Sequence, residues 1–155
     1  PSDNRTDYIK RLIGLPGDKI KFIDGDLHIN DDQILKTRIS TTDIIYCGSQ
    51  TIPVNTFKEK LPNGKTYNSA YTKKYTFGDS DTFIVPNKHY FFLGDNRDCS
   101  KDSRFLSEVG YVHEDNLVGK AQFIFFSSDY RKGSIFKFWK WPDILRMKRF
   151  FKKIN

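Results

Sequence analysis

Lys10 is a candidate for proton-transfer chemistry in this 155-residue sequence. It lies in an apolar run, Tyr8 to Ile13, where a strand would place apolar neighbours on both of its faces. Burial of an amine penalises its charged form and lowers its pKa. A fall from about 10.4 to about 7–8 takes roughly 3–5 kcal/mol and leaves a neutral amine able to deprotonate a hydroxyl. From the residues alone, however, an edge or surface lysine is the commoner case.

A turn follows Lys10 closely, with the sequence Gly14-Leu15-Pro16-Gly17-Asp18. We expect Gly14 and Gly17 to give the backbone the freedom that this turn needs. Asp18 should fix the turn through local hydrogen bonds. These are structural roles, which would help to hold the strand that carries Lys10.

A second polar segment runs from Gly94 to Arg104 and places charges of both signs around Ser100 and Ser103. The charged residues are Asp95, Arg97, Asp98, Lys101, Asp102 and Arg104. This alternation predicts an internal network of ion pairs and hydrogen bonds.

Two other interpretations of this segment are a calcium loop and a nucleophilic serine. Asp98-x-Ser100-x-Asp102 matches the opening of a calcium loop, but the sixth position is Ser103 instead of Gly and the twelfth is Val109 instead of Glu. Calcium binding is therefore weakly supported. Alternatively, Ser100 or Ser103 is itself a nucleophile activated by Lys10.

Short apolar runs between turn clusters predict hairpins, with strands near 8–14, 19–23, 27–30 and 33–39. Asp24-Gly25 is the clearest turn signal, because glycine tolerates a positive φ. Further apolar runs lie at 82–85, 90–93 and 118–126. The predicted fold class is all-β, with antiparallel sheets and hairpins. The segment from Gly94 would then leave the end of a buried strand.

Two parts of the chain have a different character. Residues 40–81 are polar and predict a variable insertion with short strands. Residues 139–155 form a basic tail, in which 143–154 carry apolar residues at helical spacing: Ile144, Met147, Phe151 and Ile154. We expect a short amphipathic helix there, capped by Asp143. Such a helix either lies on a membrane surface or packs on the sheet with a solvated basic face.

Composition limits the remaining possibilities. The length predicts one domain over 1–155, and 37% hydrophobic residues with fourteen Phe suit a globular core. A net charge of +7 fits nucleic acid or an anionic membrane. We expect no nucleic-acid partner, because the basic residues cluster in the tail and no RNP signature is present. With no apolar run of about 18 residues, the chain should be soluble by itself. The pairing of Cys47 and Cys99 stays open.

The segment around Lys10 and the segment from Gly94 to Arg104 resemble the C-terminal signature boxes of one enzyme family. The matching residues are Lys10-Arg11 with Gly14-Leu15-Pro16-Gly17-Asp18, and Gly94-Asp95-Asn96-Arg97-Asp98-Cys99-Ser100-Lys101-Asp102-Ser103-Arg104. The family is the type I signal peptidases, membrane-anchored serine proteases that use a Ser/Lys dyad to remove signal peptides from exported proteins. Cys99 departs from the usual Asn of the second box.

The resemblance implies a role for each matching residue. Lys10 would be the general base, and Ser100 would donate a hydrogen bond that orients it, which argues against Ser100 as nucleophile. Asp102 would hold that arrangement and Arg104 would pair with nearby carboxylates. The opening residues of the box would keep the shape of the loop; they are Gly94, Asp95, Asn96, Arg97 and Asp98.

The resemblance also implies substrate and location. The substrates would be signal peptides of secreted preproteins, bound extended along an exposed strand edge with small residues before the cleavage point. Membrane lipid would be a second partner, and no cofactor or metal would be needed. The protein would reside in the bacterial inner (plasma) membrane, with its catalytic domain on the periplasmic or outer side.

One element of the family pattern is missing. The nucleophilic serine of the family lies in a Pro-Ser-x-Ser-Met box upstream of the lysine, and no such box occurs between Pro1 and Lys10. We therefore expect this chain to be a C-terminal portion that carries the base without the nucleophile and that cleaves no signal peptide alone. The alternative function is a non-catalytic module that binds peptides or a membrane surface.

Overall fold

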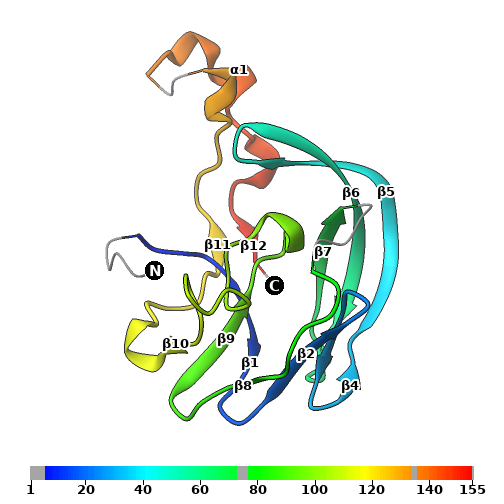
Figure 1. Ribbon diagram of the computed structural model, residues 1–155. Coiled ribbons are helices and arrows are strands. Elements are labelled where there is room, and N and C mark those ends of the chain that lie inside the picture. Colours follow the sequence, from blue (N-terminus) through cyan, green and yellow to red (C-terminus); the bar gives the residue numbers. More distant parts are fainter. Residues whose placement is uncertain (1–5, 73–76, 134–135, 155) are drawn as a thin grey trace. The chain divides into compact units, whose positions relative to one another are not determined.

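The computed structural model describes residues 6–72, 77–133 and 136–154, without the side chains at 41, 42 and 130 (Figure 1). The chain divides into two compact units, Pro1–Val118 and Gly119–Asn155, and each is described by itself. Antiparallel strand pairs make up most of the regular structure, which confirms the all-β fold class. Within the described ranges, no helix combines the length and the apolar character that crossing a bilayer requires.

A three-stranded sheet of the first unit leads to Lys10. Its strands, in spatial order, are β1 (Arg11–Gly14), β9 (His89–Leu93) and β10 (Val112–His113). Arg11 pairs with Leu93, so Lys10 and Gly94 leave the ladder at the same end. The strand expected near 8–14 is present but begins at Arg11, because β9 ends at Leu93 and leaves residues 8–10 beyond the ladder.

A second sheet of the same unit has the order β4-β3-β2-β8. Its strands are β4 (Asp32–Gln33), β3 (Asp26–Ile29), β2 (Lys19–Ile23) and β8 (Phe83–Ile84). The turn between β2 and β3 has φ of 50° at Asp24 and 77° at Gly25, the left-handed conformation that the Asp-Gly pair predicted. This confirms the hairpin.

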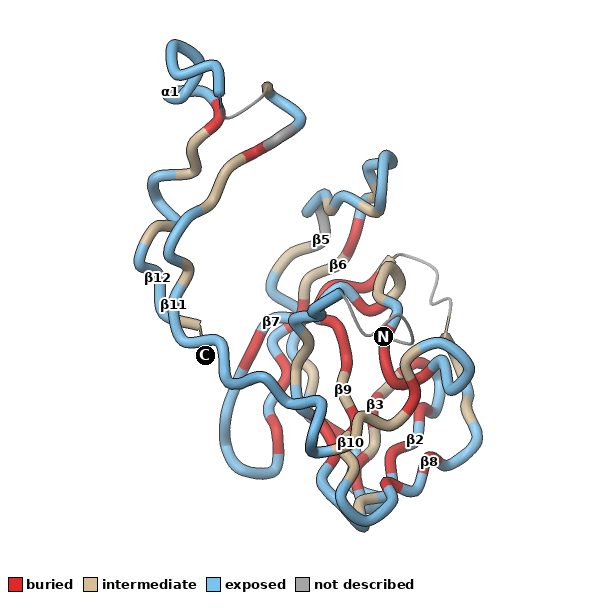
Figure 2. The backbone as a smooth tube through the Cα atoms, turned by 90° about the vertical axis from the view of Figure 1, so that its left-hand side faces the viewer, coloured by how far each residue is buried: buried red, intermediate tan, exposed pale blue. Residues whose placement is uncertain are grey.

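These two sheets share one hydrophobic core, visible as the buried stretches in Figure 2. Alternate residues of β2 point inward, and Ile20 and Phe22 are almost fully buried. Phe91 and Leu93 of β9 join them. Each such side chain contributes about 1.5–3 kcal/mol by leaving water. The core thus anchors the end of β9, where the segment from Gly94 begins.

The third sheet consists of β5 (Leu35–Cys47), β6 (Gln50–Lys60) and β7 (Thr66–Thr72), in that order. The prediction of short strands in 40–81 was wrong. β5 and β6 pair over almost their whole length, from Leu35 with Lys60 to Cys47 with Gln50, around two register shifts. Alternation was weak because one face of this sheet buries polar side chains, as shown below. The expected strand at 33–39 is divided between β4 and β5.

In residues 119–133 and 136–154, the second unit has one strand pair and one short helix: β11 (Phe123–Ile124), β12 (Lys152–Lys153) and α1 (Trp141–Ile144). A short C-terminal helix is therefore present, but its expected range of 143–154 was wrong. Leu145 is extended and bridges to Ser128, and later residues continue to pair with 122–127. This β pairing overrides the helical spacing. The apolar run at 118–126 forms a strand only at β11.

Short 3-10 turns complete the described structure. They are η1 (Arg97–Cys99), η2 (Glu114–Asn116), η3 (Tyr130–Lys132), η4 (Phe138–Lys140) and η5 (Met147–Arg149). The first of them lies in the polar segment after β9 and immediately precedes Ser100.

Candidate active site

Lys10 and Ser100 meet although 90 residues separate them in the sequence. Lys10 Nζ donates a hydrogen bond of 2.7 Å to Ser100 Oγ. Lys10 comes just before β1, whereas Ser100 follows η1, and both residues are partly buried. At this distance a neutral amine could equally accept the serine proton, so the expected donation by Ser100 stays a prediction. The contact fixes the amine in either case.

Gly94 leaves the space that this contact occupies. A methyl group built at Gly94 would lie 2.1 Å from Ser100 Oγ and 3.6 Å from Lys10 Nζ. The first distance is far inside van der Waals contact, so any larger residue would displace Ser100. The glycine at the start of the polar segment is thus required by close approach.

Asp102 and Arg104 form a buried ion pair behind Gly94. Arg104 donates from Nε to Asp102 Oδ1 at 2.8 Å and from Nη2 to Oδ2 at 2.9 Å. Asp102 Oδ2 also accepts the Gly94 N–H at 2.9 Å. Both side chains are almost inaccessible to solvent, so the pair relies on these hydrogen bonds for its stability. The predicted pairing of Arg104 with a carboxylate is present, and it connects the end of the segment to its beginning.

The pKa of Lys10 lies below its ordinary value of 10.5. Burial is the largest cause, because it penalises the ammonium. Asp102 opposes the shift by attraction, and Arg104 reinforces it by repulsion. Leu12 of the flanking strand is exposed, whereas the Tyr8 ring and the Ser100 hydroxyl both lie against the amine.

The turn after Lys10 has the expected kind of local bonding. Asp18 Oδ2 accepts the Leu15 N–H at 2.8 Å, and the Asp18 N–H donates to the Leu15 carbonyl at 3.0 Å. Gly17 has φ of 90°, which favours glycine. Gly14 is needed for a different reason: a methyl group there would lie 3.1 Å from Ile20 and Phe91 atoms. Pro16 precedes Gly17 in the turn.

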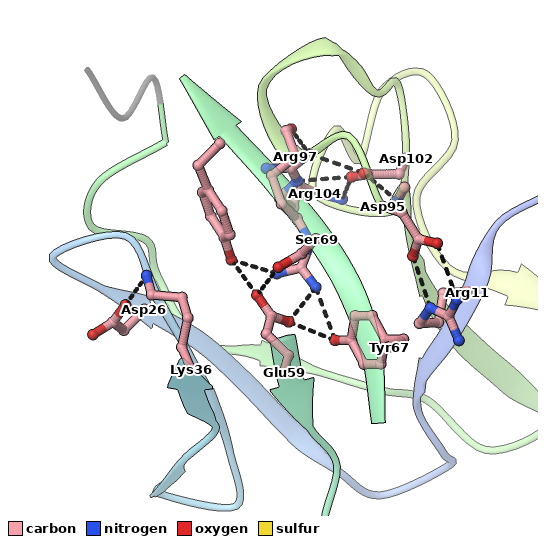
Figure 3. Close-up of polar contacts among 12 residues, drawn as sticks. Arg11, Asp26, Lys36, Glu59, Tyr67, Ser69, Asp95, Arg97, Asp102 and Arg104 are labelled. Atoms are coloured by element: carbon pink, nitrogen blue, oxygen red, sulfur yellow. Dashed lines mark hydrogen bonds and ion pairs between the residues drawn. The ribbon is translucent and has the colours of Figure 1, made fainter. Parts of the chain in front are cut away.

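The opening of the polar segment is bonded to β1 and β7. Asp95 accepts two hydrogen bonds from Arg11, at 2.7 and 2.9 Å (Figure 3). Asn96 forms a bridge with Ala70 of β7. Asp98 Oδ2 accepts from the backbone N–H and the hydroxyl of Thr72. These contacts place the loop between two sheets.

Sequence reasoning missed the partner of Arg97. This arginine is buried and donates from Nη2 to Glu59 Oε2 of β6 at 2.6 Å (Figure 3). The carboxylate also accepts from three side-chain hydroxyls, those of Tyr67, Ser69 and Tyr71. No motif marks these residues, which belong to the stretch interpreted as an insertion. The only signal was a series of hydroxyl side chains at alternate positions of β7, namely Tyr67, Ser69 and Tyr71.

Cys47 and Cys99 form a disulfide, which answers a question that the sequence left open. Cys47 is the last residue of β5, and Cys99 adjoins Ser100. The bond therefore connects the tip of the β5–β6 hairpin to the loop beside Lys10. Cys99 replaces the usual Asn of the box without disturbing the contact between Ser100 and Lys10.

The structure offers little to a metal at this loop. Among the described residues, no three His, Cys, Asp or Glu side chains are grouped so that they could hold an ion. The two carboxylates that resembled the opening of a calcium loop have other partners, since Asp98 accepts from Thr72 and Asp102 pairs with Arg104. What the site contains is an amine of lowered pKa, held by a hydroxyl and backed by a buried ion pair.

Comparison with known proteins identifies the family of this chain. Residues 1–126 match the family described as "Signal peptidase, peptidase S26". This chain belongs to the signal peptidase family. The resemblance noted in the sequence is thereby confirmed, and the matched range includes Lys10 and the segment up to Arg104.

Three bacterial members of the family are similar to this chain over nearly its whole length. Signal peptidase I of Rickettsia prowazekii (strain Madrid E) is 44% identical over 170 residues, which is 99% of this chain and 62% of that protein. That of Rickettsia rickettsii (strain Sheila Smith) is 43% identical and that of Rickettsia typhi (strain ATCC VR-144 / Wilmington) 44%, each over 99% of this chain and 61% and 62% of those proteins. The chain thus spans about three fifths of the length of these relatives.

A solved structure is also similar. It is a signal peptidase I from Enterococcus faecalis V583, with 25% sequence identity, a TM-score of 0.37, and coverage of 72% of this chain and 80% of that chain.

Proposed function

We propose that this chain supplies the general base of a signal peptidase that cleaves signal peptides from exported preproteins by a Ser/Lys dyad. The observation that carries the proposal is Lys10, an amine whose lowered pKa favours its neutral form and whose Nζ lies 2.7 Å from Ser100 Oγ. Membership of the family supports the class of reaction. The enzyme would act at the bacterial plasma membrane, on the periplasmic or outer side.

Lys10 performs the proton transfers. The neutral amine takes the proton of the serine hydroxyl while that oxygen attacks the scissile carbonyl, and the ammonium then protonates the leaving amine. Water, deprotonated by the same amine, releases the acyl group from the serine. Ser100 holds the amine by its hydrogen bond. Asp102 and Arg104 keep Gly94 and the loop in position, so that the amine stays partly dehydrated.

In this proposal neither Ser100 nor Ser103 is the nucleophile. Ser103 is fully buried, and its Oγ accepts the Phe92 N–H at 2.9 Å. Ser100 Oγ is enclosed by Gly94 on one side and Lys10 on the other. A substrate carbonyl would have to displace these contacts to reach either oxygen. In this proposal Lys10 contributes the base, and a serine other than these two contributes the attacking oxygen.

The substrate is proposed to bind beside β1. That strand lies at the end of its sheet order, so its second edge is available for main-chain hydrogen bonds to an extended peptide. Tyr8, Ile9 and Leu12 are exposed around it and offer an apolar surface to the peptide. Small residues before the cleavage point would then bring the scissile carbonyl close to Lys10.

The decisive experiment assays preprotein cleavage by the complete product of the gene that encodes these residues, in membranes. Lys10→Ala and Lys10→Arg are expected to lower kcat by about 10²–10⁴-fold, because the base is lost or remains charged. Ser100→Ala should lower kcat less, since it only orients the base. Circular dichroism would show that each variant is folded. Near-normal cleavage by either Lys10 variant would overturn the proposal.

A second function, docking to a membrane surface, is favoured by the exposed aromatics of the second unit. Phe136 is 89%, Phe125 77% and Trp139 64% exposed. Exposed basic residues accompany them: Lys132, Lys137, Lys140, Lys148, Arg149, Lys152 and Lys153. Aromatic rings and cations together suit the interface of an anionic bilayer. We propose membrane lipid as a partner of residues 119–154.

Vesicle flotation tests this partner. The chain is expected to float with vesicles containing phosphatidylglycerol, and less with vesicles of phosphatidylcholine alone. Removal of residues 143–155 should reduce flotation, as should replacement of Phe125 and Trp139 by Ser. Flotation that neither change affects would show that this surface does not bind the lipid, and failure to float with either kind of vesicle would remove lipid as a partner.

A further inference from the structure

Glu59 is a carboxylate near the end of β6, the central strand of the sheet formed by β5, β6 and β7, and it is only 1% exposed. Four donors from two elements, β7 and η1, converge on its two oxygens. They are the hydroxyls of Tyr67 at 2.6 Å, Ser69 at 2.7 Å and Tyr71 at 2.7 Å, and Arg97 Nη2 at 2.6 Å (Figure 3). A buried carboxylate with this many donors is a built feature, because each bond offsets the cost of removing the charge from water.

The ion pair of Glu59 with Arg97 remains charged inside the protein. Burial opposes ionisation of Glu59, but Arg97 and the three hydroxyls outweigh it, so that the pKa of Glu59 lies below its usual value. Arg97 also donates to the hydroxyls of Tyr67 and Tyr71 at 2.8 and 2.7 Å. The guanidinium is thereby held in one orientation by three acceptors.

Arg97 transmits this constraint to the loop that carries Ser100. It is the first residue of η1, and its main-chain carbonyl accepts a hydrogen bond from Arg104 Nη2. Arg104 in turn holds Asp102, and Asp102 accepts the N–H of Gly94. A continuous series of charged hydrogen bonds therefore leads from Glu59 to the glycine that faces Lys10 and Ser100.

We propose that Glu59 is a positioning residue for Lys10. Through Arg97 it fixes η1 and the backbone on either side of Ser100, so that the Ser100 hydroxyl and Gly94 enclose the amine. This inference rests on the proposed function, because the catalytic role of Lys10 gives its enclosure a purpose. The structural effect itself requires no cleavage and can be measured on Lys10 directly.

The groups that face Lys10 define what should change. They are Ser100, the ring of Tyr8 with its centroid 5.3 Å from Nζ, and the charges of Asp102 and Arg104. Glu59 is not one of these groups, so in this proposal it acts on Lys10 only through the loop. If the loop loses its support, water reaches the amine and its pKa returns toward 10.5.

The test is an NMR titration of the Lys10 side chain in the 155-residue chain and its variants. Glu59→Gln removes the charge and turns one acceptor atom into a donor that faces other donors. Val54→Ala is the matched control, because Val54 lies in the same strand, is fully buried and belongs to no part of the series. Tyr71→Phe is a milder variant that removes one donor to Glu59 and one acceptor of Arg97.

The expected result is a rise of the Lys10 pKa by about one unit in Glu59→Gln, a smaller rise in Tyr71→Phe, and no change in Val54→Ala. If Glu59→Gln does not fold, the comparison of Tyr71→Phe with Val54→Ala decides. An unchanged Lys10 pKa in folded Glu59→Gln, or an equal rise in Val54→Ala, would overturn the proposal. Cleavage by Lys10 variants would overturn the catalytic role alone and leave this titration valid.

Discussion

Gly94 and Ser100 approach so closely that a methyl group on Gly94 would lie 2.1 Å from Ser100 Oγ. This proximity connects three features of the site. The strand end at Leu93 places Gly94 beside Lys10, the N–H of Gly94 donates to Asp102, and its missing side chain leaves room for the serine. One backbone position therefore determines how well the lysine is enclosed.

Gly94→Ala should separate Ser100 from Lys10. The added methyl group has no room, and relief of the overlap is expected to cost about 1–3 kcal/mol in free energy of unfolding. The Lys10 pKa should rise, because the displaced loop admits water. Urea denaturation and NMR titration would measure the two effects.

A second glycine serves as the control for this substitution. A methyl group at Gly78 would meet nothing within 4 Å, and its φ lies outside the left-handed range. Gly78→Ala should therefore leave both stability and the Lys10 pKa almost unchanged. If Gly94→Ala behaves like Gly78→Ala, the close approach does not restrict this position.

Lys10 should make stability depend on pH in the alkaline range. Its pKa is lowered in the folded chain and is about 10.5 when unfolded, so between these two values the unfolded state binds more protons. The free energy of unfolding contributed by Lys10 therefore rises with pH across that window, as the unfavourable burial of the ammonium is relieved. Below the folded pKa the contribution is constant.

Lys10→Met isolates this contribution, since methionine carries no charge at any pH. The difference in unfolding free energy, wild type minus Lys10→Met, should increase as the pH rises from the folded pKa of Lys10 to about 10.5. Guanidinium titrations at several pH values would provide it. Parallel stability curves for the two proteins would mean that the folded chain does not lower the pKa of this amine.

The disulfide should contribute substantially to stability. Cys47 and Cys99 are 52 residues apart, and a closed loop of that length lowers the entropy of the unfolded chain by an amount worth about 4 kcal/mol. The double variant Cys47→Ser with Cys99→Ser should lose about this much in urea denaturation. Dithiothreitol should destabilise the wild type to the same level and have no effect on the variant. A wild type indifferent to reduction would contradict the bond.

Local sequence patterns predicted the parts of the fold that local geometry determines. Asp24-Gly25 predicted a hairpin because its left-handed φ values are a property of that dipeptide. Lys10 and Ser100 could be assigned together only through the resemblance to the signal peptidases, since 90 residues separate them and neither has a pattern that points to the other.

Sequence-based interpretation failed at Glu59 and at residues 143–154 for the same physical reason, which is contact between residues far apart in the sequence. Glu59 was missed because its partner Arg97 lies 38 residues away, and a glutamate in a polar strand normally faces solvent. The helix expected at 143–154 had suitable spacing, but pairing of the chain after Leu145 with 122–128 replaced it. Spacing describes one face of an element and does not specify what covers that face.

The 155-residue chain by itself is expected to leave a preprotein uncut. Ser100 contacts the base, but its oxygen already bonds Lys10 and lies against Gly94, so a peptide carbonyl would have to displace these contacts. Incubation of the purified chain with a labelled preprotein in detergent would measure this, with the complete gene product as positive control. Cleavage by the chain that Ser100→Ala abolishes and Ser103→Ala does not would make Ser100 the nucleophile and Lys10 its direct partner.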